Sequence, residues 1–92
     1  MDKMEAFKTA HKAMGDRVMV NAMEELAELI QAISKGLRGK LDKNNLAEEL
    51  ADVSIIIDWI KIYFGIDQQE VNKWVDYKLN RIFKREKSGK LS

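Results

Sequence analysis

The sequence predicts an all-α protein, a compact antiparallel bundle of about four helices completed by dimerisation. Apolar residues recur at helical spacing along most of the chain, and no segment alternates apolar and polar residues as a half-buried strand would. The chain contains no proline, and its five glycines fall between the periodic segments. Capping residues follow several of these glycines, so stop and start signals divide the chain into four helical segments.

The four helices are expected over about residues 3–14, 16–35, 45–64 and 68–87. Glycine just beyond a helix tolerates the left-handed conformation that ends it. The glycines in such positions are Gly15, Gly36 with Gly39, Gly65 and Gly89. The expected N-terminal caps are Asp16 for the second helix, Asn45 with Glu48 for the third, and Asp67 with Glu70 for the fourth. The β-rich segment VSIII at 53–57 lies inside a helical pattern and is expected to be buried helix.

The whole chain, residues 1–92, is expected to form a single domain, because a length of 92 residues allows one modest core. It has no cysteine, which excludes disulfides and thiolate metal sites. No apolar run approaches the roughly 20 residues that span a bilayer, and the N-terminal segment has no signal-peptide pattern. A cytoplasmic protein without a membrane partner is expected. The basic tail at about 86–92 is expected to be a flexible extension.

The sequence contains one acidic phrase twice, EELAEL at 24–29 and EELADV at 48–53. On the second helix, Glu28 lies about 40° and Glu25 about 100° around from Glu24. The apolar residues of that helix fill the neighbouring arc, so these acids border an ordinary apolar face. Taken alone, the first phrase favours a solvated acidic surface.

The second phrase differs, because Asp52 lies within the apolar face of the third helix and Glu49 lies in the same sector. The apolar neighbours one and two turns further on are Ile55, Ile56 and Trp59. An unpaired buried carboxylate needs a cationic partner, a metal ion or a proton. Asp52 is therefore expected to be buried, either in a metal site or in a buried salt bridge.

The fourth helix carries a cation within its apolar stripe. Lys78 lies four residues after Trp74 and four before Ile82, and Arg81 lies at the edge of the stripe. Lys78 is the natural partner for an acidic site or a phosphate. The alternative is a lysine whose stem covers apolar surface while its amine reaches water.

Acids at positions i and i+3 on two packed helices can converge on one cation. An all-oxygen ligand set suits a hard cation, Mg²⁺ or, in its place, Mn²⁺. A di-iron bundle would need a Glu-x-x-His motif on two helices. The only histidine, His11, is not in such a motif, and its position on the stripe of Met4 and Phe7 favours a packed core residue.

The segments EELAE at 24–28 and ELAD at 49–52 resemble the Glu-Glu-x-x-Glu and Glu-x-x-Asp motifs of the MazG-like all-α nucleoside triphosphate pyrophosphohydrolases. The resemblance extends from about Asp16 to Arg85, and KLNR at 78–81 is similar to the basic residues that follow the acidic motifs in that family. It implies a Mg²⁺-dependent enzyme that cleaves nucleoside triphosphates between the α and β phosphates. It also implies a homodimer or a dimer of dimers, with the nucleotide bound near the interface.

The resemblance also implies roles for individual residues. The metal ligands would be Glu25, Glu28, Glu49 and Asp52, and Glu24 would be a further ligand or would orient the attacking water together with Glu25. The triphosphate would contact Lys78 and Arg81. Charge and position add Lys35, Arg38 and Lys40 as phosphate contacts, with a solvated basic loop as the alternative. Base stacking would fall to Trp59, Tyr63 or Trp74, although aromatic residues at helical spacing are commonly core.

Two other classes of function fit the same residues. One is a non-catalytic helical dimerisation or regulatory module, whose acids pair with the basic tail. The other is a nucleic-acid-binding helical protein that uses residues 78–90, although nucleic acid is not the expected partner. The preferred base and sugar do not follow from the sequence.

Overall fold

A computed structural model of the chain describes residues 2–87, and within them it contains four α-helices and no strand. The helices are α1 (Lys3–Met14), α2 (Arg17–Leu37), α3 (Lys43–Phe64) and α4 (Gln68–Lys87). The predicted all-α class is confirmed. No helix in the described range is long and apolar enough to cross a bilayer. Residues 88–92 of the basic tail, including Gly89, lie outside the described residues.

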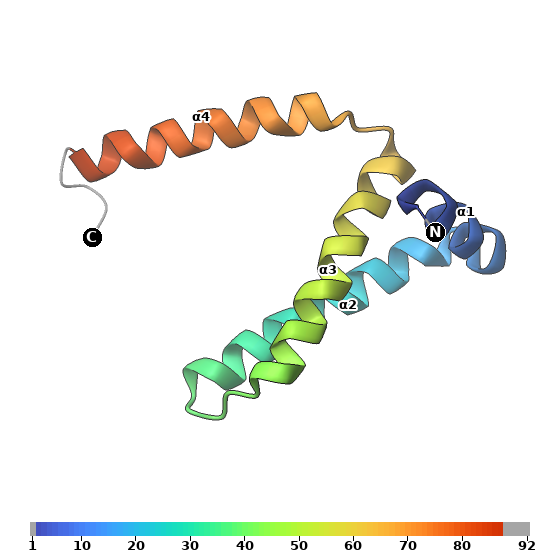
Figure 1. The fold of residues 1–92 in the computed structure, drawn as a ribbon, viewed down its shortest axis with the longest axis horizontal. Coiled ribbons are helices and arrows are strands. Elements are labelled where there is room, and N and C mark those ends of the chain that lie inside the picture. The colour runs from blue at the N-terminus through green and yellow to red at the C-terminus, as the bar shows by residue number, and fades with distance from the viewer. Residues whose placement is uncertain (1, 88–92) are drawn as a thin grey trace.

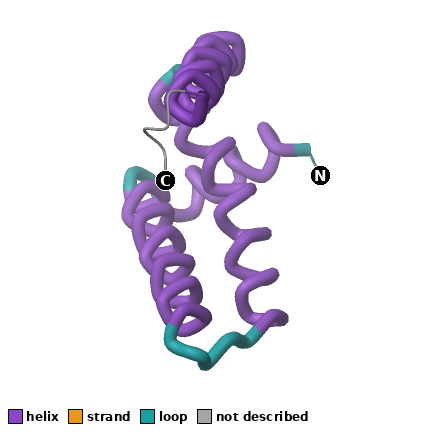
Figure 2. Tube along the Cα trace, turned by 90° about the vertical axis from the view of Figure 1, so that its left-hand side faces the viewer, coloured by secondary structure: helices purple, strands orange, loops and turns teal. Residues whose placement is uncertain are grey.

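The centre of the fold is the antiparallel hairpin of α2 and α3, with α1 packed across the end that lies away from their connecting loop (Figures 1 and 2). Small side chains on α2 let the two helices approach closely. The buried apolar residues of the described chain are Phe7, Val18, Ala22, Ala32, Val53 and Ile56. Phe7 of α1 meets the ring edges of Trp59 and Tyr63, which attaches α1 to α3.

The fourth helix stands apart from this core. The packed helix pairs are α2 with α3, α1 with α3, and α1 with α2, and Figure 1 shows α4 projecting away from the hairpin. The described chain measures 50 × 37 × 21 Å. The expected compact packing therefore holds within one chain only for α1 to α3.

Several predicted helix ends need correction. Asp42 rather than Asn45 caps α3, because the Asp42 carboxylate accepts the backbone N–H of Asn45 at 3.0 Å. Asp16 precedes α2 but makes no side-chain cap, since its carboxylate instead accepts the Tyr63 hydroxyl at 2.7 Å. The Asp67 carboxylate accepts the backbone N–H of Gln69, two residues on, and the N–H of Glu70 donates to the Asp67 carbonyl instead.

The end of α2 also differs from the prediction, because Gly36 lies inside the helix. A Cβ atom at Gly36 would lie 3.3 Å from Cδ1 of Leu41. Glycine at this position therefore lets the loop fold back onto the last turn of α2. Gly39 supplies the positive φ angle, 78°, that turns the chain toward α3.

Candidate metal site

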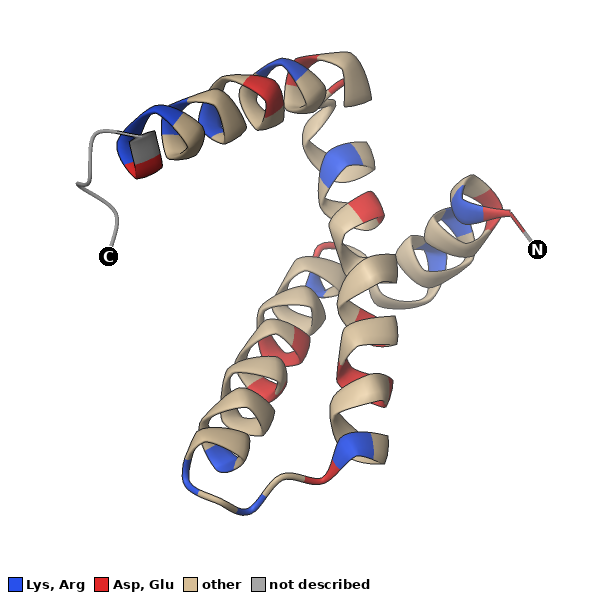
Figure 3. Ribbon diagram, turned by 60° about the vertical axis from the view of Figure 1, so that its left-hand side comes forward, with Lys and Arg blue, Asp and Glu red and all other residues tan. Residues whose placement is uncertain are grey.

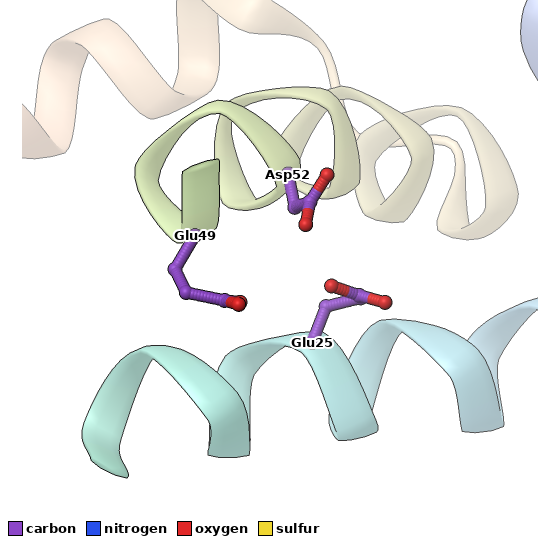
Figure 4. Close-up of side chains that lie close together, drawn as sticks. All are labelled: Glu25, Glu49 and Asp52. Carbon is purple, nitrogen blue, oxygen red and sulfur yellow. The ribbon is translucent and has the colours of Figure 1, made fainter. Parts of the chain in front are cut away.

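Three carboxylates from the two hairpin helices converge on one point. Glu25 of α2 and Glu49 and Asp52 of α3 each place one oxygen within 4.8 Å of the others (Figure 4). The spacing of three residues puts Glu49 and Asp52 on one side of α3, and the antiparallel packing brings Glu25 opposite them. The three carboxylates thus come from both acidic phrases, the first on α2 and the second on α3.

The electrostatics of the three acids are unfavourable without a cation. Burial first, and then the nearby carboxylates Glu28 and Asp52, raise the pKa of Glu25 above its ordinary value of 4.5. Burial and the same two neighbours raise the pKa of Glu49. Oε2 of Glu25 and Oε2 of Glu49 are buried and accept no hydrogen bond. These two oxygens therefore lack the hydrogen bonds that would offset the cost of removing a carboxylate from water.

No lysine or arginine of α1, α2 or α3 neutralises the cluster. The ion pairs of these helices lie elsewhere, at Asp58 with Lys3 and Lys61, and at Asp16 with His11. Figure 3 shows acidic residues on the central turns of α2 and α3, and both basic and acidic residues along α4. The predicted salt bridge to these acids is therefore not formed within α1 to α3.

The other predicted acids lie at different distances from this centre. Glu28 is close enough to raise the pKa of both Glu25 and Glu49, so it flanks the cluster. Glu24 is exposed and is not among the converging acids. The roles assigned to these side chains stay predictions.

The expected burial of Asp52 is wrong for the single chain, since no charged residue of its described part is buried. The helical pattern predicts that Ile55, Ile56 and Trp59 are buried around Asp52. Ile56 is buried and Trp59 is half-buried, but Ile55 is exposed, because none of the four described helices covers that side. A carboxylate at the rim of a core keeps access to water.

A hollow of about 170 Å³ adjoins the cluster. Its lining residues are Asn21, Glu25, Asp52, Ile55, Ile56 and Trp59. The indole N–H of Trp59 is buried and donates no hydrogen bond. Sequence reasoning missed Asn21, although its position four residues before Glu25 places it on the same side of α2. A group bound in the hollow could contact the carboxylates of Glu25 and Asp52 and also the apolar side chains in its wall.

The predicted basic residues do not meet the acids within one chain. Lys78 and Arg81 lie on the separate helix α4, where the Arg81 guanidinium stands 5.9 Å from the ring centre of Tyr77. Lys35 lies in the last turn of α2, and Arg38 just after it donates to the Ser34 carbonyl. Both are exposed near the tip of the hairpin, as is Lys40.

His11 also departs from expectation, because it is exposed rather than part of the core. Its ring stacks on Phe7, and its Nε2 lies 3.8 Å from the carboxylate of Asp16.

Comparison of the chain with protein-family models, with curated proteins and with solved structures finds no match.

The donor set fits a hard divalent cation. Carboxylate oxygens from Glu25, Glu49 and Asp52 converge, two of these carboxylates have an oxygen without a hydrogen bond, and soft ligands are absent from the group. Mg²⁺ is commonly held by one to a few protein carboxylates while water and phosphate oxygens complete its shell.

Proposed function

We propose that this protein is a Mg²⁺-dependent nucleoside triphosphate pyrophosphohydrolase, with Mn²⁺ able to replace Mg²⁺. It would cleave ribo- or deoxyribonucleoside triphosphates between the α and β phosphates, giving the monophosphate and pyrophosphate. The observation that carries the proposal is the convergence of Glu25, Glu49 and Asp52 from two helices, with buried oxygens that lack partners. The resemblance of the two acidic phrases to the MazG-like motifs supplies the reaction.

In this proposal Glu25, Glu49 and Asp52 hold the cation and Glu28 completes the set. The cation would neutralise phosphate charge and lower the pKa of a bound water. The water oxygen would bond to phosphorus, the bond from that phosphorus to the oxygen bridging the α and β phosphates would break, and the water would give up a proton. Glu24 and Glu25 would orient the water, and one of these carboxylates would receive its proton.

The hollow beside the acids would receive part of the nucleotide, with Trp59 at its wall. The triphosphate would require cationic contacts that one chain does not bring to the acids, because Lys78 and Arg81 lie on the separate α4. The proposal therefore includes an assembly of at least two copies, in which α4 or the loop residues Lys35 and Arg38 reach the triphosphate.

The test is a panel of ribo- and deoxyribonucleoside triphosphates incubated with the protein and Mg²⁺, with products separated by ion-exchange chromatography. Monophosphate and pyrophosphate should appear in equal amounts, and EDTA should stop their formation. Release of orthophosphate alone would contradict the predicted bond cleavage. No turnover and no metal-dependent nucleotide binding across the panel would favour the non-catalytic dimerisation or regulatory module.

A matched pair of variants tests the site. Glu49→Gln removes a converging carboxylate, whereas Glu48→Gln changes its exposed neighbour on the same helix. Loss of a ligand should lower turnover by about 100-fold or more, and the neighbour should retain near-normal turnover. Equal losses in the two variants would show that the general acidity of the helix matters rather than the converging group.

A further inference from the structure

The hollow beside the acids extends from the converging carboxylates toward the end of the hairpin that α1 covers. Asn21 lies one helical turn before Glu25 on α2, and Ile56 lies one turn after Asp52 on α3. Because the two helices are antiparallel, both steps of about 6 Å run in the same direction, away from the loop that joins α2 and α3. Trp59 lies almost one turn further along α3 and also lines the hollow. The hollow therefore continues the acid site along the length of the hairpin.

The volume of the hollow limits what it can hold. At about 170 Å³ it equals roughly five or six water molecules at liquid density. Sites that enclose a whole drug-sized ligand measure about 300–1,000 Å³. The hollow thus has room for one sugar or one small ring, but not for a whole nucleoside.

Two polar groups that line the hollow have no hydrogen-bond partner among residues 2–87. The indole N–H of Trp59 is buried and donates no hydrogen bond, and no hydrogen bond involves the side-chain amide of Asn21. An indole can only donate, whereas an amide offers both donors and an acceptor. A hydroxyl group can accept from the first and donate to the second. The remaining wall, at Ile55 and Ile56, is apolar and suits the carbon atoms of a sugar ring.

The next step rests on the proposed function, in which the cation held by Glu25, Glu49 and Asp52 binds the phosphates. In a nucleotide the sugar follows the α phosphate, so the sugar reaches the hollow before the base does. Of the sugar hydroxyls, the 3′ hydroxyl is nearer to the phosphates, and ribo- and deoxyribonucleotides share it. We infer that the hollow binds the sugar of the substrate, and that Asn21, with the indole N–H of Trp59, recognises its 3′ hydroxyl.

This assignment makes Asn21 a specificity-determining residue. A site that hydrogen-bonds a substrate hydroxyl rejects an analogue without it, because the polar groups of the site are then left unpaired. The protein should therefore prefer a deoxynucleoside triphosphate to its 2′,3′-dideoxy counterpart. The base lies beyond the hollow, so this preference should be similar for different bases. Trp59 contributes its N–H to the sugar instead of its ring face to the base.

The test compares kcat/KM for dCTP and 2′,3′-dideoxy-CTP, with Mg²⁺, in the wild-type protein and in full-length Asn21→Leu. Leucine keeps the size of asparagine and removes the amide. The wild-type protein should favour dCTP about tenfold or more, and the ratio should fall close to one in Asn21→Leu. Trp59→Phe keeps an aromatic ring, removes the N–H and should also lower the ratio. Gln31→Leu removes an exposed amide from the same helix and should keep the wild-type ratio.

A binding measurement gives the same comparison without turnover. Titration calorimetry with dCMP and 2′,3′-dideoxy-CMP should show a preference for dCMP in the wild-type protein and its loss in Asn21→Leu. Circular dichroism checks that each variant remains helical.

The outcomes separate the sugar assignment from the proposed catalysis. A wild-type protein that hydrolyses dCTP and dideoxy-CTP equally well would be a pyrophosphohydrolase without this contact, and the inference would be overturned. Equal losses for both substrates in Asn21→Leu would also overturn it. A changed preference between dCTP and dATP, with the same discrimination against dideoxynucleotides, would place the base in the hollow instead. A protein that neither hydrolyses nor binds any of these nucleotides would contradict the proposed function itself, and the sugar assignment with it.

Discussion

At the residue scale, the acids of the hairpin are placed where they destabilise the metal-free fold. The pKa values of Glu25 and Glu49 are raised by burial and by neighbouring carboxylates. A group with a raised pKa in the folded state contributes most to stability below its unfolded pKa, here about 4.5, and this contribution is lost as the pH rises through the raised pKa. The metal-free protein should therefore lose stability on going from pH 4.5 toward neutrality through these two groups.

Glu49→Gln should remove one source of this loss. In EDTA at pH 8 the variant should melt at a higher temperature than the wild-type protein, while near pH 4 the two should differ little. Circular dichroism during heating measures both values. Glu48→Gln is the control, because Glu48 lies outside the converging group, and it should change the pH dependence less. A Glu49→Gln protein that is less stable than wild type at pH 8 would indicate a salt bridge instead of a cation site.

Asp58 shows the opposite behaviour. Hydrogen bonds from Lys3 and Lys61, at 3.0 and 3.1 Å, hold the pKa of Asp58 below its ordinary value of 3.8 despite partial burial. Its contribution to stability is present above pH 3.8 and is lost as the pH falls through the lowered pKa.

Asp58→Asn should therefore reduce the free energy of unfolding at pH 7 by about 0.5–1 kcal/mol, a modest loss because Lys3 is largely exposed. The difference from wild type should shrink below pH 3. Urea unfolding at the two pH values measures the change. Asp76→Asn on α4 is the control for loss of a surface charge, and a comparable effect there would contradict a specific role for the Lys3 contact.

Sequence reasoning found the converging acids because helical spacing is local. Three residues between Glu49 and Asp52 fix their common side wherever α3 packs. The exposure of Asp52 was not predictable in the same way. Whether Ile55 is covered depends on where the remaining helices lie, and no single-helix pattern contains that information. The same limit explains why Lys78 and Arg81 were expected at the acids while α4 lies apart from them.

At the element scale, helix positions followed from periodicity, while several ends depended on competition between neighbouring polar residues. Asp42, Asn44 and Asn45 can all cap a helix. In the structure Asp42 is the cap, so α3 begins at Lys43. Asp16 was available as a cap for α2, but the Tyr63 hydroxyl, 47 residues away, binds its carboxylate. Such a long-range partner is invisible in the sequence near Asp16.

The fourth helix should depend on contacts that one chain does not provide. Three of its large apolar side chains, Trp74, Leu79 and Phe83, are more than half exposed. Isolated helices of this length are marginal in water, and α4 contains many residues of low helix propensity. A synthetic peptide of residues 66–87 should therefore be less than half helical by circular dichroism at 25 °C. A mostly helical peptide would show that α4 is stable without cover.

At the scale of the whole molecule, the hairpin carries two properties on different residues. The converging carboxylates Glu25, Glu49 and Asp52 come from one chain, and the exposed apolar residues Ile30 and Ile57 lie outside the converging group. Cation binding should therefore depend on the acids of each chain, and substitution of these two apolar residues should not change it.

This separation can be measured with two variants and two assays. Mn²⁺ binding is followed from the loss of its free-ion signal in electron paramagnetic resonance, and assembly is followed by sedimentation. Ile30→Gln with Ile57→Gln should leave the Mn²⁺ dissociation constant within about twofold, whatever its effect on assembly, since distant sites act independently. Glu49→Gln should weaken Mn²⁺ binding and leave assembly intact. If the apolar substitutions abolish Mn²⁺ binding in a protein that remains helical, the cation site must include residues of a second copy.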